Sequence, residues 1–388
     1  MFGRISAIVC SICLMLCICG CGEVKNNADT IQFASWGSKS EVEILKPLLD
    51  EFEHQTPDIK IEFIHIPQNY FQKIHLLFAS KKAPDVIFLN NQYLPVYANA
   101  GLLREFTDND FDKEEFYPQS LDALSWDGSV YAVPRDISTL VIFYNKDIFK
   151  DKNVPYPHSG WTMEEFLQSA QKLTSLPDVF GISFEEDVLF YLPYLMSFGG
   201  GVLSDDLTSD ISNTPESKAG LQFYADLRSK YHVAPLKSES ASATMAQMFL
   251  QGRLGMYLSG RWIVPKFREE AFFDWDVAEF PKGSAGSVTP LDASGWAVSA
   301  QSKNPQAALK LVKFLSSKEA IEKFTESGLI VPAREDVALS EKFLDGQKPY
   351  NSRAFIDSVN NAKPTPVSVD YRIILDKTKA QNEYIFNQ

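Results

Sequence analysis

Residues 30–89 alternate strand-like and helix-like patterns, and this alternation constrains the fold more than any other part of the chain. Short β-like runs cover 30–34 and 59–63, and 86–89 is an uninterrupted apolar run, typical of a parallel strand buried on both faces. Amphipathic patterns between them predict two helices, the crossover connections that parallel strands need. The order βαβαβ therefore predicts an α/β fold built on a parallel sheet.

Three residue pairs predict where helices begin. Ser40 with Glu43, and Thr162 with Glu165, have the spacing of a capping box, in which the two side chains satisfy each other's backbone N–H groups. Asn304-Pro305 combines a cap residue with proline at the first helical position. We therefore expect helices to start at these three places.

Polar and aromatic side chains follow the first and third predicted strands. Trp36 and Ser38 come after the first, and Asn90, Asn91 and Tyr93 come after the third. In an open α/β sheet, ligands bind just beyond the carboxyl ends of the strands. Because these residues are aromatic or hydrogen-bonding rather than typical acid–base catalysts, we expect a binding site at this edge.

The stretch 245–262 combines three signals. Residues 245–250 carry an apolar helical face, Gly252 suits the left-handed cap that ends a helix, and 254–258 is an apolar strand-like run. Gly260 and Trp262 follow that strand. On this stretch alone two interpretations are open: a ligand approaches the Gly260 backbone and stacks on Trp262, or a turn ends the strand with a core tryptophan.

The other tryptophans bear on this choice. Gly295-Trp296 repeats the Gly–Trp pair beside another strand-like run, and Trp36 also stands next to a glycine. These matching edges favour the ligand platform. Trp161 and Trp275 have flanks typical of a helix start and of a strand, so we expect both in the core.

The N-terminus carries all the cysteines, namely Cys10, Cys13, Cys17, Cys19 and Cys21. Arg4 precedes an apolar run over 5–18, which is short for a membrane span and typical of a secretory signal peptide. Gly20-Cys21 resembles the bacterial lipobox. We expect a signal peptide over 1–20, a lipid such as palmitate on Cys21 and a polar tether over 21–28; an uncleaved anchor is the alternative. Cleavage leaves no second cysteine, which excludes internal disulfides.

Charge and motif content exclude several function classes. A net charge of -13 argues against a nucleic-acid surface, which needs clustered Lys and Arg. No Gly-x-Ser-x-Gly elbow occurs, and the glycines at 199–201 lack the lysine of a phosphate loop. The histidines form no close ligand pair: His54, His65, His75, His158 and His232. We expect no metal, no cofactor and no enzyme activity.

A set of short motifs resembles family 1 extracellular solute-binding proteins, the sugar-binding lipoproteins of ABC importers related to maltose-binding protein. In chain order they are the lipobox, the Trp36 strand and helix, Ala83-Pro84-Asp85-Val86-Ile87, Tyr144-Asn145-Lys146-Asp147, Trp161-Thr162-Met163-Glu164-Glu165-Phe166, Gly260-Arg261-Trp262, Gly295-Trp296 and Pro332-Ala333-Arg334. The resemblance spans essentially the whole mature chain. No single motif is decisive, but the ordered set is specific.

The resemblance implies an α/β, two-lobed periplasmic-binding-protein-like fold of type II, with a crossing hinge and the ligand in the cleft. Lobe 1 would hold 29–134 and 292–334, and lobe 2 would hold 135–291 and 335–388. The hinge would pass near Pro134-Arg135 and again near 290–292. The C-terminus is short for the family, which often has another helix after the region of Tyr371.

The implied function is an extracytoplasmic, membrane-anchored sugar-binding lipoprotein of bacteria. It would act as a monomer, capture a carbohydrate, in the first place an oligosaccharide, by hinge closure, and pass it to the permease subunits of an ABC importer. It would touch the membrane through its lipid only and bind no nucleic acid. The residues that match the family's ligand positions are Trp36, Ser38, Asn90, Asn91, Tyr93, Asp136, Phe190, Gly260, Trp262, Gly295, Trp296 and Arg334.

Two alternatives stay open. A secreted glycoside hydrolase would share the aromatic residues and need two facing carboxylates, for which Asp136 and Asp187 are available. The ligand could also be a glycerol phosphate, a polyamine or a peptide. A phosphate would need several converging cations, and Arg135, Arg261 and Arg334 are the candidates near the expected cleft. Arg334 could equally form an ion pair within the protein.

Overall fold

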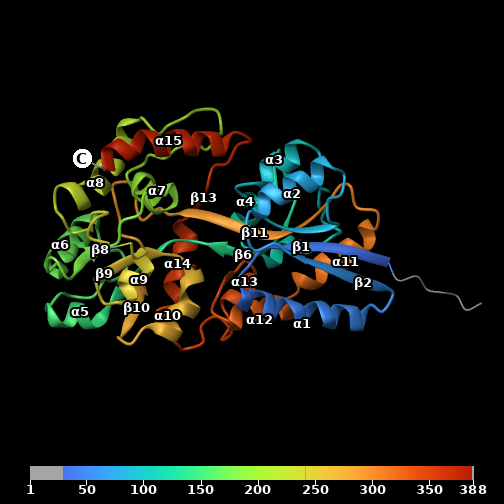
Figure 1. Cartoon of the computed structure of the whole chain (residues 1–388), viewed down its shortest axis with the longest axis horizontal. Coiled ribbons are helices and arrows are strands. Elements are labelled where there is room, and N and C mark those ends of the chain that lie inside the picture. Colours follow the sequence, from blue (N-terminus) through green and yellow to red (C-terminus); the bar gives the residue numbers. More distant parts are fainter. Residues whose placement is uncertain (1–28, 241, 387–388) are drawn as a thin grey trace, which may run out of the picture.

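The computed structural model describes residues 29–240 and 242–386. Over these ranges the chain forms two α/β halves, each built on its own sheet (Figure 1). The predicted signal peptide (1–20), the tether (21–28) and Cys21 lie outside the described residues and stay predictions. None of the described helices is both long and apolar enough to cross a membrane.

The first half lies at the right of Figure 1 and is built from three separate parts of the chain. Its elements are β1 (Asp29–Ser35), α1 (Lys39–Gln55), β2 (Ile59–His65), α2 (Tyr70–Ala79), β3 (Val86–Asn90), α3 (Leu94–Asn99), η1 (Lys113–Glu115), α4 (Pro118–Ala123), β4 (Ser125–Trp126), β5 (Ser129–Val130), β6 (Val133–Ser138), β11 (Pro290–Val298), α11 (Pro305–Leu315), α12 (Lys318–Glu326), β12 (Val331–Pro332), α13 (Glu335–Ala338) and β13 (Lys363–Pro364).

The second half lies at the left of Figure 1 and also ends the described chain. Its elements are β7 (Val141–Asn145), α5 (Lys146–Asp151), α6 (Met163–Leu173), β8 (Phe180–Ile182), α7 (Val188–Ser197), α8 (Pro215–Ser229), α9 (Met245–Leu250), β9 (Leu254–Ser259), η2 (Arg261–Ile263), α10 (Val264–Glu270), β10 (Trp275–Ala278), α14 (Arg353–Asn361) and α15 (Tyr371–Phe386).

The sheet of the first half has the strand order β12-β6-β11-β3-β1-β2, with β13 attached to β11. β1 pairs in parallel with β2 and with β3, which confirms the parallel sheet that the sequence predicts. β11 returns from the second half and runs antiparallel between β3 and β6. The strand ends of β1 and β3 therefore meet a strand that arrives from the other half.

Burial explains why β3 is uninterruptedly apolar. Its first four side chains, Val86 to Leu89, are all fully buried. In Figure 1, α1, α11 and α12 lie below this sheet while α2, α3 and α4 lie above it. Helix α1 buries Leu45, Leu48, Leu49 and Phe52 as one stripe, as its apolar spacing predicts.

The predicted helix starts are confirmed in two cases and wrong in one. Thr162 and Glu165 form the capping box of α6, and α11 begins at Pro305 after Asn304. Helix α1 begins earlier than expected, because Ser38 rather than Ser40 accepts the backbone N–H of Glu41, at 3.3 Å. This earlier start places Glu41 in the first turn of α1, where its side chain meets Arg135.

The sheet of the second half has the order β10-β7-β9-β8. Alternate residues of β7 point to opposite faces: Ile142 and Tyr144 join the core under α6 and α7, whereas Phe143 packs with α10 and α14 on the other face. Trp161 and Trp275 are buried in this half, which confirms that they are core residues.

Strand β6 contains a proline in its second position. It continues through Pro134 to Ser138. The strand tolerates the proline because the pairing with β11 is irregular at this point: Gly295 lies opposite Pro134 and Ser294 lies opposite Asp136. The bulge keeps Asp136 in a strand, at the edge of the other half.

The chain crosses between the halves from β6 to β7, from β10 to β11, from α13 to α14, from α14 to β13 and from β13 to α15. The lobe boundaries given above stay predictions. The first sheet includes β6 to Ser138 and β11 from Pro290, a few residues beyond them. Helix α13 contacts α12 and β12 of the first half, although 335–388 is predicted for lobe 2.

The bulge predicts the effect of a methyl group at Gly295. A Cβ there would lie 2.2 Å from the carbonyl oxygen of Val133 and 3.0 Å from Leu124 Cδ1. We expect Gly295→Ala to lower the free energy of unfolding by about 1–3 kcal/mol, measured by urea denaturation, because β6 and β11 must move apart. Equal stability of the wild type and Gly295→Ala would contradict the bulge.

Candidate functional site

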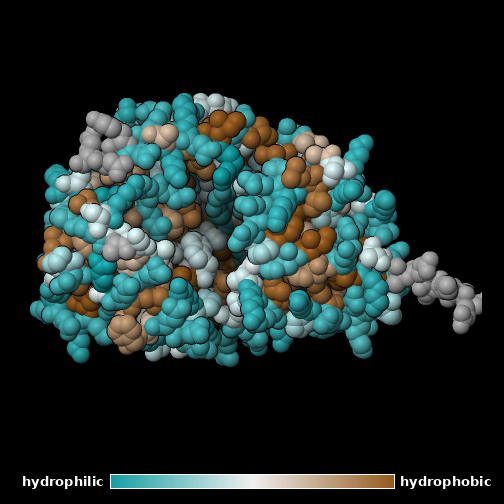
Figure 2. Space-filling view, in the orientation of Figure 1, coloured by the Kyte–Doolittle hydropathy of each residue, from teal (hydrophilic) through white to brown (hydrophobic). Residues whose placement is uncertain are grey.

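Three hollows lie between the two halves, since each is lined by residues of both, and Figure 2 shows the surface hollowed there. The outer hollow, of about 970 Å³, lies between the start of α1 and the start of α10. The inner hollow, of about 170 Å³, shares Trp36, Glu41, Trp262 and Leu329 with it. The far hollow, of about 510 Å³, lies between α7, α15 and Asp292. We call the three together the groove.

Trp36 stands at the end of β1 and lines both the outer and the inner hollow. Its indole packs on Tyr70, Phe71 and Phe88, with ring centroids 5.0, 5.3 and 4.3 Å away. These contacts hold the ring while leaving it partly exposed. The first half therefore presents a fixed aromatic surface to the groove.

Trp262 presents a second aromatic surface, from the other half, to the same two hollows. Its side chain is 38% exposed, which is high for a tryptophan. The ring lies against Gly260, where an added Cβ would come within 1.8 Å of Trp262 Cζ3. Gly260 thus makes room for the ring, and this replaces the expectation that a ligand approaches the Gly260 backbone.

Asp136 lines the inner hollow but does not stand alone. Arg135 Nε donates to its Oδ1 at 2.5 Å, and Arg135 Nη1 donates to Glu41 Oε1 at 2.5 Å. The Arg135 guanidinium also lies 4.0 Å from the Phe88 ring centroid. The cation engages one oxygen of each carboxylate, so each keeps a second oxygen that can accept a hydrogen bond.

Ser38 and Asn90 also border this region. Ser38 lines the outer hollow, although its hydroxyl is engaged as the cap of α1. Asn90 ends β3 opposite Ser294, which lines the inner hollow. The Oδ1 of Asn90 is buried and has no hydrogen-bond partner among the described residues. An unpaired buried acceptor is costly, so a donor from a ligand or a water would stabilise it.

The far hollow is lined by Phe190, one of the ligand residues that the resemblance implies, and by Asp187, the carboxylate considered above for a hydrolase. Two further residues were missed by the sequence analysis: Glu185, which follows β8, and Arg372, which comes from α15. Asp187 Oδ1 accepts from the N–H of Leu189 and caps α7. Burial and the Asp187 charge raise the pKa of Glu185 to about 7. A partly protonated carboxyl here can both donate and accept hydrogen bonds.

Tyr93 lies at the start of α3, and its ring stacks on Phe71 with centroids 3.6 Å apart. The Arg372 guanidinium from the second half lies over it, 5.5 Å from the ring centroid. The ring is therefore covered by two protein groups.

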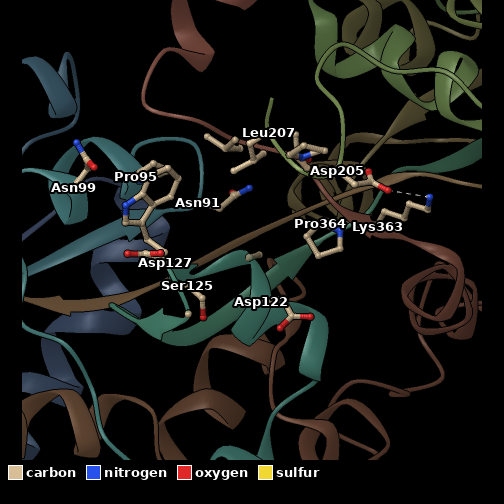
Figure 3. Close-up of a pocket in the computed structure, with 16 residues that line it drawn as sticks. Asn91, Pro95, Asn99, Asp122, Ser125, Asp127, Asp205, Leu207, Lys363 and Pro364 are labelled. Atoms are coloured by element: carbon tan, nitrogen blue, oxygen red, sulfur yellow. Dashed lines mark ion pairs between the residues drawn. The ribbon is translucent and has the colours of Figure 1, made fainter. Parts of the chain in front are cut away.

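Asn91 lines none of the three hollows of the groove, although the resemblance predicts that it binds the ligand there. Its Nδ2 donates to Asp292 Oδ1 at 2.9 Å and its Oδ1 accepts from the N–H of Ala293. Figure 3 shows Asn91 with Asp122, Asp205 and Lys363 around a different hollow, of about 690 Å³, lined also by β13. Asn91 thus ties the end of β3 to β11.

Three other predicted ligand residues are structural. Trp296 is fully buried, and its ring packs on Phe33 and Phe88 in the core. Gly295 sits in the β-bulge against Val133. Arg334 is buried and donates to Glu115 Oε2 at 2.6 Å and to Asp336 Oδ1 at 3.1 Å. Gly–Trp spacing therefore does not by itself separate a groove residue from a core residue.

Among the groove residues that the sequence analysis did not predict, only Glu185 is marked by a sequence pattern. Glu185 follows a short apolar run, 180–182, which is β8, and the rule for strand ends would have flagged it. No sequence pattern marks Arg372 or Ser294, because their positions in the groove depend on how α15 and β11 pack against distant parts of the chain. The described residues contain no group of three or more acidic, histidine or cysteine side chains that could hold a metal.

Comparison with known families decides the identity of the fold. Residues 48–348 match the model of the bacterial extracellular solute-binding proteins. The chain belongs to this family. The α/β two-lobed fold, with relatives of the maltose-binding type, is thereby confirmed.

Relatives of this solute-binding protein cover nearly the whole chain. The galactooligosaccharide-binding protein of Bacillus subtilis is 24% identical over 92% of this chain and 85% of its own length. The maltodextrin-binding protein of the same organism is 24% identical over 84% of this chain and 78% of its own. A solved ABC substrate-binding protein from Listeria monocytogenes, in complex with cycloalternan, is 29% identical with a TM-score of 0.84, covering 92% and 94% of the two chains.

The position of Glu185 predicts a pH dependence of stability. From its ordinary pKa of 4.5 up to about 7, the unfolded protein loses this proton while the folded one keeps it. Stability therefore falls as pH rises through this window. We expect Glu185→Gln to gain stability relative to the wild type between about pH 5 and about pH 8, measured by urea denaturation.

Asp187→Asn is the matched control for this experiment. Asparagine keeps the cap of α7 but removes the neighbouring charge, so the pH dependence should shrink and not disappear. If the free energies of unfolding of Glu185→Gln and the wild type differ by the same amount at every pH, the raised pKa of Glu185 is contradicted.

Proposed function

We propose that this protein captures an oligosaccharide in the groove and delivers it to an ABC importer. The observation that carries the proposal is the pair of tryptophans, Trp36 and Trp262, which come from different halves and line the same two hollows. The family membership and the sugar ligands named for its relatives support it.

The chemistry of the groove suits a sugar. A pyranose has an apolar C–H face, which an exposed indole can cover, and a rim of hydroxyls that donate and accept. Glu41, Asp136 and Asn90 offer acceptor oxygens, and Ser138 and Ser294 line the same inner hollow. A buried acceptor left unpaired costs about 1–3 kcal/mol, so the pattern of hydroxyls sets the specificity.

The length of the groove favours more than one sugar unit. The inner hollow holds Ser294, and the far hollow holds Asp292 two residues earlier on β11. Aromatic rings stand at both ends, with Trp262 at one and Phe190 at the other. A single sugar would contact one end, whereas an oligosaccharide would contact both.

The arginines argue against a phosphate ligand. Arg135 is neutralised by Glu41 and Asp136, and Arg334 lies in ion pairs away from the groove. Arg261 is 2% exposed, and its guanidinium donates to Ser352 Oγ and to the carbonyl of Gly328. The three cations therefore do not converge on one position.

A hydrolytic role has little support. Asp136 and Asp187 line different hollows, and each is already engaged, by Arg135 and by the cap of α7. Paired carboxylates that flank one bond are what glycoside hydrolysis requires. The relatives named above are binding proteins.

In the proposed cycle a ligand that contacts both halves draws them together about the crossing segments, and the closed form is what the importer recognises. A lipid on Cys21 would keep the protein at the cell membrane beside the permease.

Thermal-shift measurements with maltotriose, a galactooligosaccharide, glycerol phosphate and spermidine test the ligand class. A ligand at about 100 times its Kd stabilises the fold by about 2.7 kcal/mol. Shifts with a sugar, which is then recovered uncleaved, support the proposal. Shifts with glycerol phosphate or spermidine alone, or turnover of the sugar, overturn it.

The aromatic platform gives a sharper prediction. Trp262→Ala should weaken sugar binding by about 10- to 100-fold in calorimetry without unfolding the protein, because one stacking face is lost. Gly260→Ala should weaken it as well, since the methyl group displaces the ring. Phe272→Ala, which removes an aromatic ring that is 82% exposed and outside the groove, should leave the affinity unchanged. If Trp262→Ala binds the sugar as tightly as the wild type does, Trp262 is a structural residue and not part of the ligand platform.

The anchor is tested separately. Cys21→Ser should move the protein from the membrane fraction to the soluble fraction of the cell, because the lipid is attached through the cysteine sulfur. Labelling with a fatty-acid analogue should likewise be lost. The variant Cys19→Ser should keep both the membrane localisation and the lipid label. If Cys19→Ser loses its membrane anchor and Cys21→Ser keeps it, the cleavage site lies elsewhere.

A further inference from the structure

We propose that Arg372 and Tyr93 form a contact across the groove that holds the two halves together over a bound ligand and slows its release. The inference rests on the proposed function, since it concerns how the same groove opens. We assign Arg372 and Tyr93 to this contact between the halves, whereas the resemblance implies only that Tyr93 touches the ligand.

The two side chains belong to different halves. Tyr93 precedes α3 in the first half, and Arg372 is in the first turn of α15 in the second. The guanidinium carbon lies 5.5 Å from the centroid of the tyrosine ring, within the range of a cation–π interaction. Opening the groove separates these residues.

The tyrosine ring is held in place for this contact. Phe71 stacks on one face at 3.6 Å and 12°, and the edge of the ring lies near His75, 6.2 Å away. Since Phe71 covers one face, the other is left for the guanidinium. A ring fixed in this way loses little conformational freedom when the cation arrives.

The arginine is also anchored to its own half. On α15, Asn382 Nδ2 donates to Tyr191 Oη at 3.0 Å, and Phe386 packs edge-on against Tyr191 and Phe184. Tyr371, next to Arg372, is buried. Because α15 is fixed to α7 in this way, the position of the guanidinium follows the movement of the second half.

The place of Arg372 in α15 does not serve the helix. A cation in the first turn faces the positive end of the helix dipole, which disfavours it. No acidic residue accompanies it in that turn. The Tyr93 ring and the Asp292 carboxylate lie across the groove from it, whereas Glu185 and Asp187 line the far hollow from its own half and Asp376 follows four residues later on α15.

Arg372 lines the far hollow together with Phe190 and Gln92. A sugar bound between Phe190 and the first half therefore lies beneath the contact, and it leaves this end only when the guanidinium separates from the ring. Release, rather than capture, is the step that the contact controls.

Stopped-flow release of maltotriose, followed by tryptophan fluorescence, tests the proposal. Arg372→Gln and Tyr93→Leu should each speed release about three- to tenfold, and the double variant should be no faster than the faster single variant. Tyr93→Phe keeps the ring and should restore most of the slow release. Lys377→Gln removes the same charge from an exposed site on the same helix and should change nothing. Additive single effects, or unchanged release by Arg372→Gln, overturn it.

A ligand-free measurement separates this inference from the proposed function. Spin labels at Lys73→Cys on α2 and Lys218→Cys on α8, in a background with all five native cysteines replaced by serine, report the distance between the halves. Arg372→Gln should shift the distribution toward longer distances, and Lys377→Gln should not. If no sugar binds but this shift appears, the ligand assignment fails and the contact stands. If a sugar binds and the distribution does not move, the contact is overturned.

Discussion

The groove depends on one strand, β11, which leaves the second half and inserts antiparallel between β3 and β6. Asn91, just after β3, bonds to Asp292 and Ala293 of β11 and so fixes where the returning chain joins the sheet of the first half. The bulge of β11 at Ser294 and Gly295 keeps Asp136 at the groove despite Pro134. Without this strand, the polar end of β3 would face solvent instead of a second wall.

Charge pairing in the groove follows from the same arrangement. Arg135 sits between Glu41 and Asp136, and its guanidinium lies over Phe88. A buried charge without partners is strongly unfavourable, so the two carboxylates keep this cation tolerable inside the protein. They also leave the inner hollow lined by acceptor oxygens and aromatic rings rather than by free cations. A neutral, hydroxyl-rich ligand matches that lining.

Sequence patterns predict local features well and long-range neighbours poorly. The parallel strands, the capping box of α6 and the buried Trp161 and Trp275 follow from residue spacing, because spacing reports on one element and one face. Trp296 and Trp262 both follow a glycine near a strand. Only tertiary packing makes one of them fully buried and the other 38% exposed. The sequence alone likewise allows Arg334 to be a groove residue. Its ion pair with Glu115, more than two hundred residues away in the chain, becomes visible only in the folded structure.

The contact between Gly260 and the Trp262 ring has a consequence for redesign of the groove. The ring occupies the volume that a side chain at 260 would need, so the two positions form one packing unit. A smaller residue at 262 would free 260 to carry a polar side chain into the groove, whereas any larger residue at 260 requires the loss of the indole. A change of ligand class at this end therefore requires substitutions at 260 and 262 together. Most variants that change position 260 alone would displace the Trp262 ring.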